Sequence, residues 1–127
     1  MTDRHILLVD DDVTILSLLK ELLVDEGYRI STAKNGREAL GILIGQKPDL
    51  LIMDISLPDM SGLDVLGQMS VARNPVPVLL ITAYGSSNDA IKGVQLGALD
   101  FITKPFDLDK LVAAVHRALD VAEASPR

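Results

Sequence analysis

Apolar and polar positions alternate in blocks along this chain, and the blocks predict a repeated strand–helix pattern. Short apolar runs indicate buried strands, whereas apolar residues spaced three and four apart indicate amphipathic helices. The first unit shows both patterns, since the apolar run at residues 6–9 is followed by leucines at helical spacing between residues 16 and 23. We expect strands near residues 5–9, 29–33, 50–54, 78–82 and 100–103, and helices near residues 13–26, 36–45, 62–71, 87–96 and 107–121.

Strands that alternate with helices predict right-handed crossovers and a parallel sheet covered by helices on both faces. The expected helix-end signals are Asp12 and Asp107 as N-caps, Asn35 with Glu38 as a capping-box variant, and Gly27 and Gly97 at C-termini. Gly93 lies inside the fourth helix, where glycine costs about 1 kcal/mol relative to alanine. It either weakens a helix beside a surface that rearranges or permits close packing on the sheet, and the sequence leaves both interpretations open.

Acidic residues follow two of the predicted strands. Asp10, Asp11 and Asp12 come directly after the first strand, and Asp54 ends the third. Ligand sites of open α/β sheets lie at the carboxyl ends of the strands, so we expect these carboxylates to converge. Adjacent carboxylates repel one another, and oxygen ligands suit Mg²⁺ or Mn²⁺. The sequence therefore predicts a divalent-cation site.

The other two strand ends carry groups that bind phosphate oxygens. Thr82, followed by the small Ala83, ends the fourth strand, and Lys104 ends the fifth. A hydroxyl and an ammonium group can each donate to a phosphoryl oxygen. Together with the acids, they point to phosphoryl transfer.

Composition narrows the function class further. The 127 residues suit one domain, and the net charge of −6 argues against nucleic acid binding by this domain itself. Without cysteine, disulfides, thiolate zinc sites and thiol catalysis are excluded. The chain has no membrane-length apolar stretch and no signal-peptide pattern at residues 1–4, so we expect a cytoplasmic protein without membrane partners.

From about residue 6 to residue 119 the chain resembles the receiver domain of two-component response regulators. The residues that carry this resemblance are Val9-Asp10-Asp11, Met53-Asp54, Leu57-Pro58 with Gly62, Ile81-Thr82-Ala83, Gly97-Ala98 and Lys104-Pro105-Phe106. The resemblance implies a flavodoxin-like (βα)5 fold, a five-stranded parallel doubly wound sheet with strand order 2-1-3-4-5. Residues 1–122 would form the receiver domain, and 123–127 a polar tail or the start of a linker.

The resemblance also implies a role for each site residue. Asp54 is the expected phosphoacceptor. The expected ligands of Mg²⁺, with Mn²⁺ as an alternative, are Asp10, Asp11, Asp54 and the backbone carbonyl of Ser56. The expected phosphate contacts are the Thr82 hydroxyl, the Ala83 backbone N–H and Lys104.

Further residues are expected to control switching and phosphoryl lifetime. Thr82 and Phe101 take the switch positions, and phenylalanine lacks the hydroxyl that tyrosine supplies there in many receivers. A cis bond before Pro105 would aim Lys104 inward. Ser56 and Tyr84 flank the path of an attacking water, and we expect bulky Tyr84 to slow hydrolysis.

The implied function is signalling rather than enzymatic turnover, with only the domain's own phosphotransfer and autodephosphorylation. The expected donor is a histidine kinase or phosphotransfer protein. Phosphorylation would change the surface of the fourth helix, fifth strand and fifth helix, acting on an output domain or downstream protein in transcription regulation, with homodimerisation as one consequence.

Three alternatives compete with this interpretation. A haloacid-dehalogenase-type phosphatase also uses a strand-end aspartate, but it needs an acid two residues later, where this chain has Ser56. A flavodoxin-like nucleotide-binding module needs a Ser/Thr/Gly-rich phosphate loop, and carboxylates after the first strand would repel phosphate. A degenerate receiver would take no phosphate, although all five key positions are filled here.

Overall fold

A computed structural model describes residues 3–83 and 87–124 of the chain. Strands and helices alternate throughout this part. The elements are β1 (His5–Val9), α1 (Val13–Asp25), β2 (Arg29–Ala33), α2 (Gly36–Gly45), β3 (Leu50–Asp54), α3 (Gly62–Val71), β4 (Val78–Ala83), α4 (Ser87–Gln95), β5 (Asp100–Lys104) and α5 (Leu108–Ala124).

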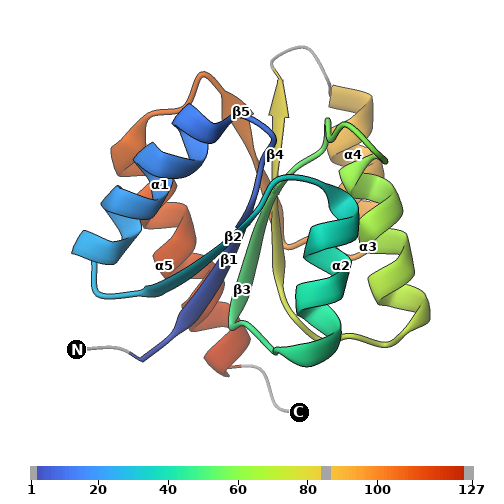
Figure 1. The fold of residues 1–127 in the computed structure, drawn as a ribbon, viewed down its shortest axis with the longest axis horizontal. Helices are drawn as coiled ribbons and strands as arrows, with labels where there is room; N and C mark the ends of the chain where they lie inside the picture. The colour runs from blue at the N-terminus through green and yellow to red at the C-terminus, as the bar shows by residue number, and fades with distance from the viewer. Residues whose placement is uncertain (1–2, 84–86, 125–127) are drawn as a thin grey trace.

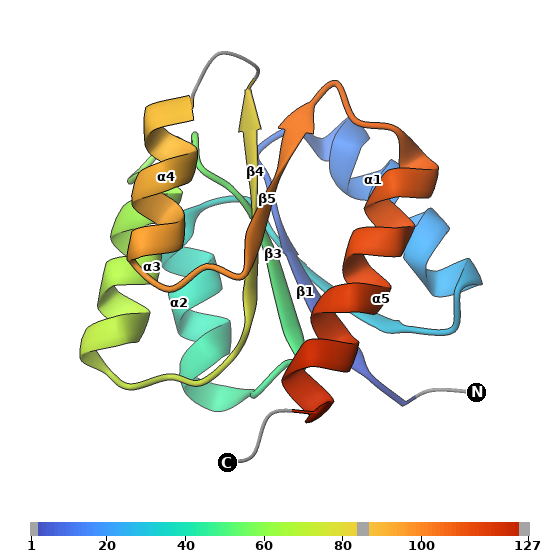
Figure 2. The ribbon, with the colours of Figure 1, turned by 180° about the vertical axis from the view of Figure 1, so that it is seen from behind.

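All the strands pair in parallel in one sheet of order β2-β1-β3-β4-β5. Helices α1 and α5 cover one face of the sheet, and α2, α3 and α4 cover the other (Figures 1 and 2). This is the five-stranded, doubly wound (βα)5 fold that the sequence predicted, with the predicted strand order.

Two apolar clusters form the core, one on each face of the sheet. Successive residues of a strand point to opposite faces, so neighbours in β1 and β3 divide between the clusters. Ile6, Leu8, Leu50 and Ile52 pack towards α1 and α5, and Leu7, Val9, Leu51 and Met53 pack towards α2 and α3. The central strands β1 and β3 are buried at every position, which explains their uninterrupted apolar runs.

The predicted element boundaries agree with the structure to within three residues. Strands β4 and β5 each run one residue further than predicted, and α5 ends at Ala124 rather than 121. Asp12 and Asp107 cap α1 and α5 as expected, since each accepts hydrogen bonds from two backbone N–H groups of the first turn. Gly27 and Gly97 both take positive φ, at 98° and 112°.

The capping box expected at α2 is only half formed. Asn35 accepts from the Glu38 N–H at 2.8 Å, but the Glu38 carboxylate accepts from the Lys34 N–H, one residue before the cap. The reciprocal arrangement occurs instead at α3, between Ser61 and Asp64. That pair follows a Ser-x-x-acid pattern in the sequence, an additional helix-start signal.

Gly93 permits close packing of α4 on the sheet, which supports the second of the two interpretations left open above. A Cβ at this position would overlap Leu80 Cδ1 of β4, and Leu63 lies 3.5 Å from the same point. Helix α4 therefore sits directly on the sheet. Within the described residues, no helix has both the length and the apolar character needed to cross a membrane.

Candidate functional site

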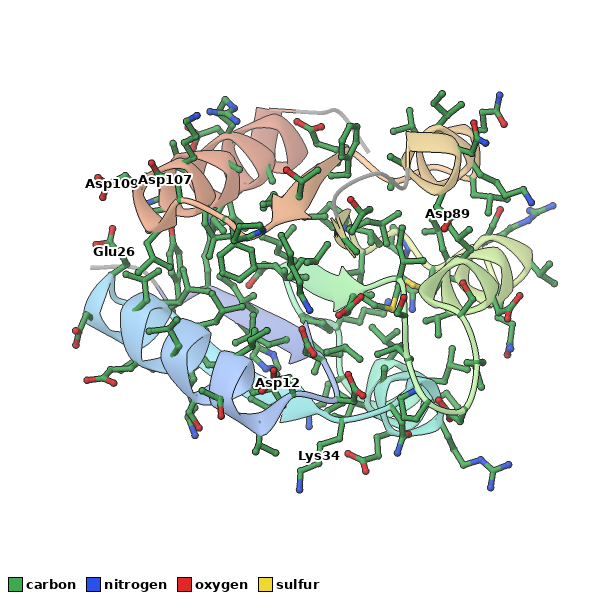
Figure 3. All side chains as sticks on the ribbon, turned by 90° about the horizontal axis from the view of Figure 1, so that it is seen from above. Asp12, Glu26, Lys34, Asp89, Asp107 and Asp109 are labelled. Atoms are coloured by element: carbon green, nitrogen blue, oxygen red, sulfur yellow. The ribbon has the colours of Figure 1, made fainter. Side chains whose placement is uncertain are left out.

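The predicted acidic residues converge at the carboxyl edge of the sheet. Val9 pairs with Met53 in the parallel register, so Asp10 and Asp54 lie side by side where β1 and β3 end. Figure 3 looks onto this edge from above, with Asp12 at the start of α1 and Lys34 before α2. Asp10 is 1% exposed and Asp54 is 5% exposed, which is unusual for carboxylates unless they are paired.

Lys104 supplies the pairing cation. Its Nζ donates to Asp54 Oδ2 at 2.6 Å and to Asp10 Oδ2 at 3.0 Å. To reach them, the side chain crosses from β5 past β4. Burial lowers the pKa of Lys104, but its hydrogen bonds to Asp54 and Asp10 and their negative charges outweigh burial, so the pKa lies above its ordinary value. Lys104 is therefore a charged counterion in this state.

The second oxygen of each buried carboxylate is held by a backbone amide. Asp10 Oδ1 accepts from the Asp12 N–H at 2.9 Å, and Asp54 Oδ1 accepts from the Ser56 N–H at 2.8 Å. Each carboxylate is therefore fixed in orientation from both sides. Carboxylates held in this way need little further ordering before they bind a cation or react.

Asp11 completes an oxygen-rich group that fits a hard divalent cation. One carboxylate oxygen each from Asp10, Asp11 and Asp54 lie within 4.8 Å of one another. Asp11 is exposed and faces solvent, where water can complete a coordination shell. Asp12 is not part of this group, because its side chain caps α1 instead.

The remaining predicted residues divide between buried and exposed positions. Thr82 is 2% exposed and pairs in register with Thr103, and Ala83 pairs with Lys104. Phe101 on the edge strand β5 is 40% exposed. The Lys104–Pro105 peptide bond is cis, and Ser56 is exposed on the β3–α3 loop. Tyr84 lies outside the described residues.

Two contacts of the site have no signal in the sequence. Lys104 was expected to bind phosphate, and its ion pairs with both aspartates depend on a strand order that residue spacing does not give. Asp59 accepts hydrogen bonds from backbone N–H groups at the N-terminus of α2, 22 and 23 residues away in the sequence. Such contacts form only in the folded chain.

Comparison with known proteins gives the same family at the sequence and structure levels. The response regulator receiver domain family matches residues 6–116. The transcriptional regulatory protein GlrR of Escherichia coli (strain K12) is 40% identical over 91% of this chain, and the match spans only 26% of GlrR. The chain thus covers about a quarter of that relative's length.

Other relatives match over nearly their whole length. Sporulation initiation phosphotransferase F of Bacillus subtilis (strain 168) is 39% identical, with 94% of this chain and 96% of that protein covered. A CheY-like response regulator receiver domain protein from Methanospirillum hungatei JF-1 superposes with a TM-score of 0.90 at 31% identity, over 96% of this chain and 98% of that one. With motif order, strand order and the buried acid–lysine site all in agreement, the chain belongs to the response regulator receiver domain family of two-component systems.

Proposed function

We propose that this domain accepts a phosphoryl group on Asp54 from a histidine kinase or phosphotransfer protein. The observation that carries the proposal is the convergence of Asp10, Asp54 and Lys104 at one buried edge of the sheet, with Asp11 beside them. A carboxylate oxygen of Asp54 attacks the phosphorus, the bond from phosphorus to the donor breaks, and the donor keeps the electron pair. The product is an acyl phosphate on Asp54.

Neutralising charge is most of what this transfer requires, because both reactants are anionic. Asp10, Asp11, Asp54 and the Ser56 carbonyl would hold Mg²⁺, with Mn²⁺ as an alternative. When bound, the cation would supply positive charge that offsets the negative charge of the carboxylate and the phosphoryl group. Lys104 would exchange its bond to Asp54 for one to a phosphoryl oxygen, while Thr82 and the Ala83 N–H would contact others.

The output surface we propose lies on α4, β5 and α5. Several large apolar side chains are exposed on α4, on the segment that follows it and on β5: Ile91, Val94, Leu96, Leu99 and Phe101. A phosphoryl group that draws Thr82 towards it would leave space for Phe101 to turn inward. Binding of phosphate in one of two packings then shifts the population between them.

Partners follow from this surface and from the relatives. We propose that the domain, residues 1–122, controls an output domain or a separate protein, and that phosphorylation favours a homodimer through the same surface. The name of GlrR includes transcriptional regulation, whereas that of sporulation initiation phosphotransferase F describes phosphoryl transfer. We favour an output in transcription regulation. The domain then acts as a regulatory phosphoacceptor rather than as an enzyme on other substrates, apart from autodephosphorylation, which Ser56 and Tyr84 would tune.

Intact mass spectrometry after incubation with acetyl phosphate and Mg²⁺ tests the proposal. We expect wild type to gain the mass of one phosphoryl group, and EDTA to prevent the gain. Asp54→Asn should gain nothing. Asp12→Ala is the matched control, because it removes an acid of the same run that lies outside the cation group, and it should still be phosphorylated.

Two outcomes would overturn the proposal. Wild type that gains no mass from acetyl phosphate or from any phosphorylated histidine kinase tested would indicate a degenerate receiver. Equal gain in Asp54→Asn would place the phosphoryl group on another residue.

A further inference from the structure

The β3–α3 loop, residues 55–61, carries Ser56 and is closed at its base. Ser56 and Ser61 form an antiparallel bridge, and the Gly62 N–H donates to the Ile55 carbonyl at 2.7 Å. Gly62 packs so closely here that a Cβ would lie 2.6 Å from the Asp54 carbonyl oxygen. The loop is thus anchored at Ile55 and Gly62 against the end of β3, and Ser56 lies between this anchor and the tip, residues 57–60, which projects towards α2.

Asp59 attaches this tip to the N-terminus of α2. Its two carboxylate oxygens accept from the Gly36 N–H at 2.8 Å and from the Arg37 N–H at 2.9 Å. Amides in the first turn of a helix have no partner within the helix, and the helix dipole favours a negative charge there. These hydrogen bonds, that from Gly36 foremost, hold the pKa of Asp59 below its ordinary value although the residue is exposed.

A second, apolar contact fixes the same two segments independently of charge. A Cβ on Gly36 would lie 2.5 Å from Met60 Cγ and 2.8 Å from Met60 Sδ. Met60 therefore rests directly on the first residue of α2, at a place where any side chain would displace it. The loop tip is held by a carboxylate on one side and by a thioether on the other.

Helix α2 already has capping groups of its own. Asn35 accepts from the Glu38 N–H, and Glu38 accepts from the Lys34 N–H. The Asp59 contacts add a link between two separate elements of the fold. One of these elements carries Ser56, whose N–H also orients Asp54.

We propose that Asp59 is a positioning residue for the divalent-cation site. Its two hydrogen bonds to the N-terminus of α2, together called the clip below, attach the loop tip to that helix. They thereby hold Ser56 where its backbone carbonyl can bind the cation. This inference rests on the proposed function and extends it to a residue outside the ligand set. Loss of the clip lets the loop sample other conformations, so cation binding must then include the cost of ordering the loop.

Calorimetric titration with Mg²⁺ tests the clip on the whole chain. We expect Asp59→Ala to raise the dissociation constant roughly threefold to tenfold, at or just below the usual effect of losing an outer-shell partner. Glu38→Ala is the matched control, because it removes a carboxylate from the same helix end without touching the loop. It should lower thermal stability about as much as Asp59→Ala but leave Mg²⁺ affinity unchanged.

Two more variants separate positioning from simple destabilisation. Asp59→Asn keeps one acceptor oxygen without the charge and should give an intermediate Mg²⁺ affinity. Gly36→Ala keeps Asp59 but displaces Met60, and it should weaken Mg²⁺ binding in the same direction. At saturating Mg²⁺, Asp59→Ala should recover the wild-type rate of phosphorylation by acetyl phosphate, because the defect lies in affinity.

The possible results test the role of Asp59 separately from the cation site on which it rests. Wild type that binds Mg²⁺ with the same affinity as both Asp59→Ala and Gly36→Ala would overturn the clip alone. Equal loss of affinity in Asp59→Ala and Glu38→Ala would also overturn it, since helix stability would then explain the effect. Wild type that does not bind Mg²⁺ would overturn the cation site itself.

Discussion

The inner and outer halves of the site are built differently. At the ends of β1 and β3, Asp10 and Asp54 are almost wholly buried, and both oxygens of each carboxylate have hydrogen-bond donors. On the outer side, β5 is an edge strand with no fully buried residue, and Phe101 is 40% exposed. Only Lys104 connects the outer strand to the inner carboxylates by a described side-chain hydrogen bond.

This difference matches two physical requirements of a phosphorylation switch. Phosphoryl transfer is fastest when the nucleophile and the charges around it are already in place, which the inner half provides. A change of surface needs a region whose alternative packing costs little, which a half-exposed edge strand provides. Under the proposed function, phosphate binding at the ends of β1 and β3 and the response at the edge strand β5 would be divided between different strands of one sheet.

The largest expected effect is that of Lys104→Met, which removes the hydrogen bonds between the outer strand and the inner carboxylates. Two buried carboxylates would then lack their cation, and breaking a fully buried pair typically costs 3–5 kcal/mol. Because the Lys104 side chain is 25% exposed, we expect a loss of about 2–4 kcal/mol in the free energy of unfolding by denaturant. Mg²⁺ should restore more stability to Lys104→Met than it adds to wild type.

The pH dependence of this effect follows from the raised pKa of Lys104. A cation whose folded pKa exceeds its unfolded value contributes its full stabilisation below the unfolded pKa, about 10.4 for lysine, and loses it as pH rises through the folded pKa. Lys34→Met, at an exposed lysine near the same edge, should change stability by less than about 0.5 kcal/mol. Equal stability of Lys104→Met and wild type would show that the halves are not coupled through this side chain.

Helix α4, which packs on β4 and β5 beside the outer half of the site, should be firmly seated on the sheet. Gly93→Ala should destabilise the protein by about 1–3 kcal/mol, because the added methyl group overlaps Leu80 and overpacks the interface. Gly41→Ala is the matched control within α2, with nothing within 4 Å of its Cβ, and should stabilise by up to about 1 kcal/mol. Chemical denaturation measures both. Stabilisation by Gly93→Ala would mean that α4 is loosely packed and moves away from the sheet easily.

The elements of this fold were predictable because their signals are local. The buried run of β1, the leucine spacing of α1 and the Asp12 cap all lie within twenty residues of each other. Each signal reflects a period or a backbone requirement that a short segment satisfies by itself. The predicted end of α5 at residue 121 is too early, because Val121-Ala122-Glu123-Ala124 contains good helix formers and the helix-stopping Pro126 comes only after them.

Contacts between distant segments were only partly predictable. The convergence of Asp10 and Asp54 follows once their strands are assumed to be parallel neighbours. The ion pairs of Lys104 depend on how far a side chain reaches across β4, and the Asp59 contact depends on where the α2 N-terminus lies relative to the loop. No periodicity encodes these positions, because they are set by the packing of whole elements.

A smaller effect is expected for the exposed side chain of the outer half. Phe101→Ala should lower the free energy of unfolding by about 1 kcal/mol or less, because the ring is already 40% exposed and a fully buried phenylalanine costs 3–5 kcal/mol. The same variant should reduce any phosphorylation-induced dimerisation, measured by light scattering with acetyl phosphate. A stability loss near 3 kcal/mol would show that Phe101 is part of the core. The outer half would then be as firmly packed as the inner half.

The smallest expected effect lies at the opposite end of β1, where His5 is buried without a buried counterion. Burial, aided by Arg29 and opposed by Asp49, lowers the pKa of His5, and its Nε2 lies 2.7 Å from Ser31 Oγ. The unfolded chain then binds a proton more readily than the folded one, so stability falls as pH drops below about 6.5, the unfolded value, towards the lowered folded pKa. A single proton limits this slope to about 1.4 kcal/mol per pH unit. His5→Gln should flatten the slope of unfolding free energy against pH between about pH 7 and 5. An unchanged slope would mean that the pKa of His5 is the same in the folded and unfolded states, and that its burial carries no cost in protonation.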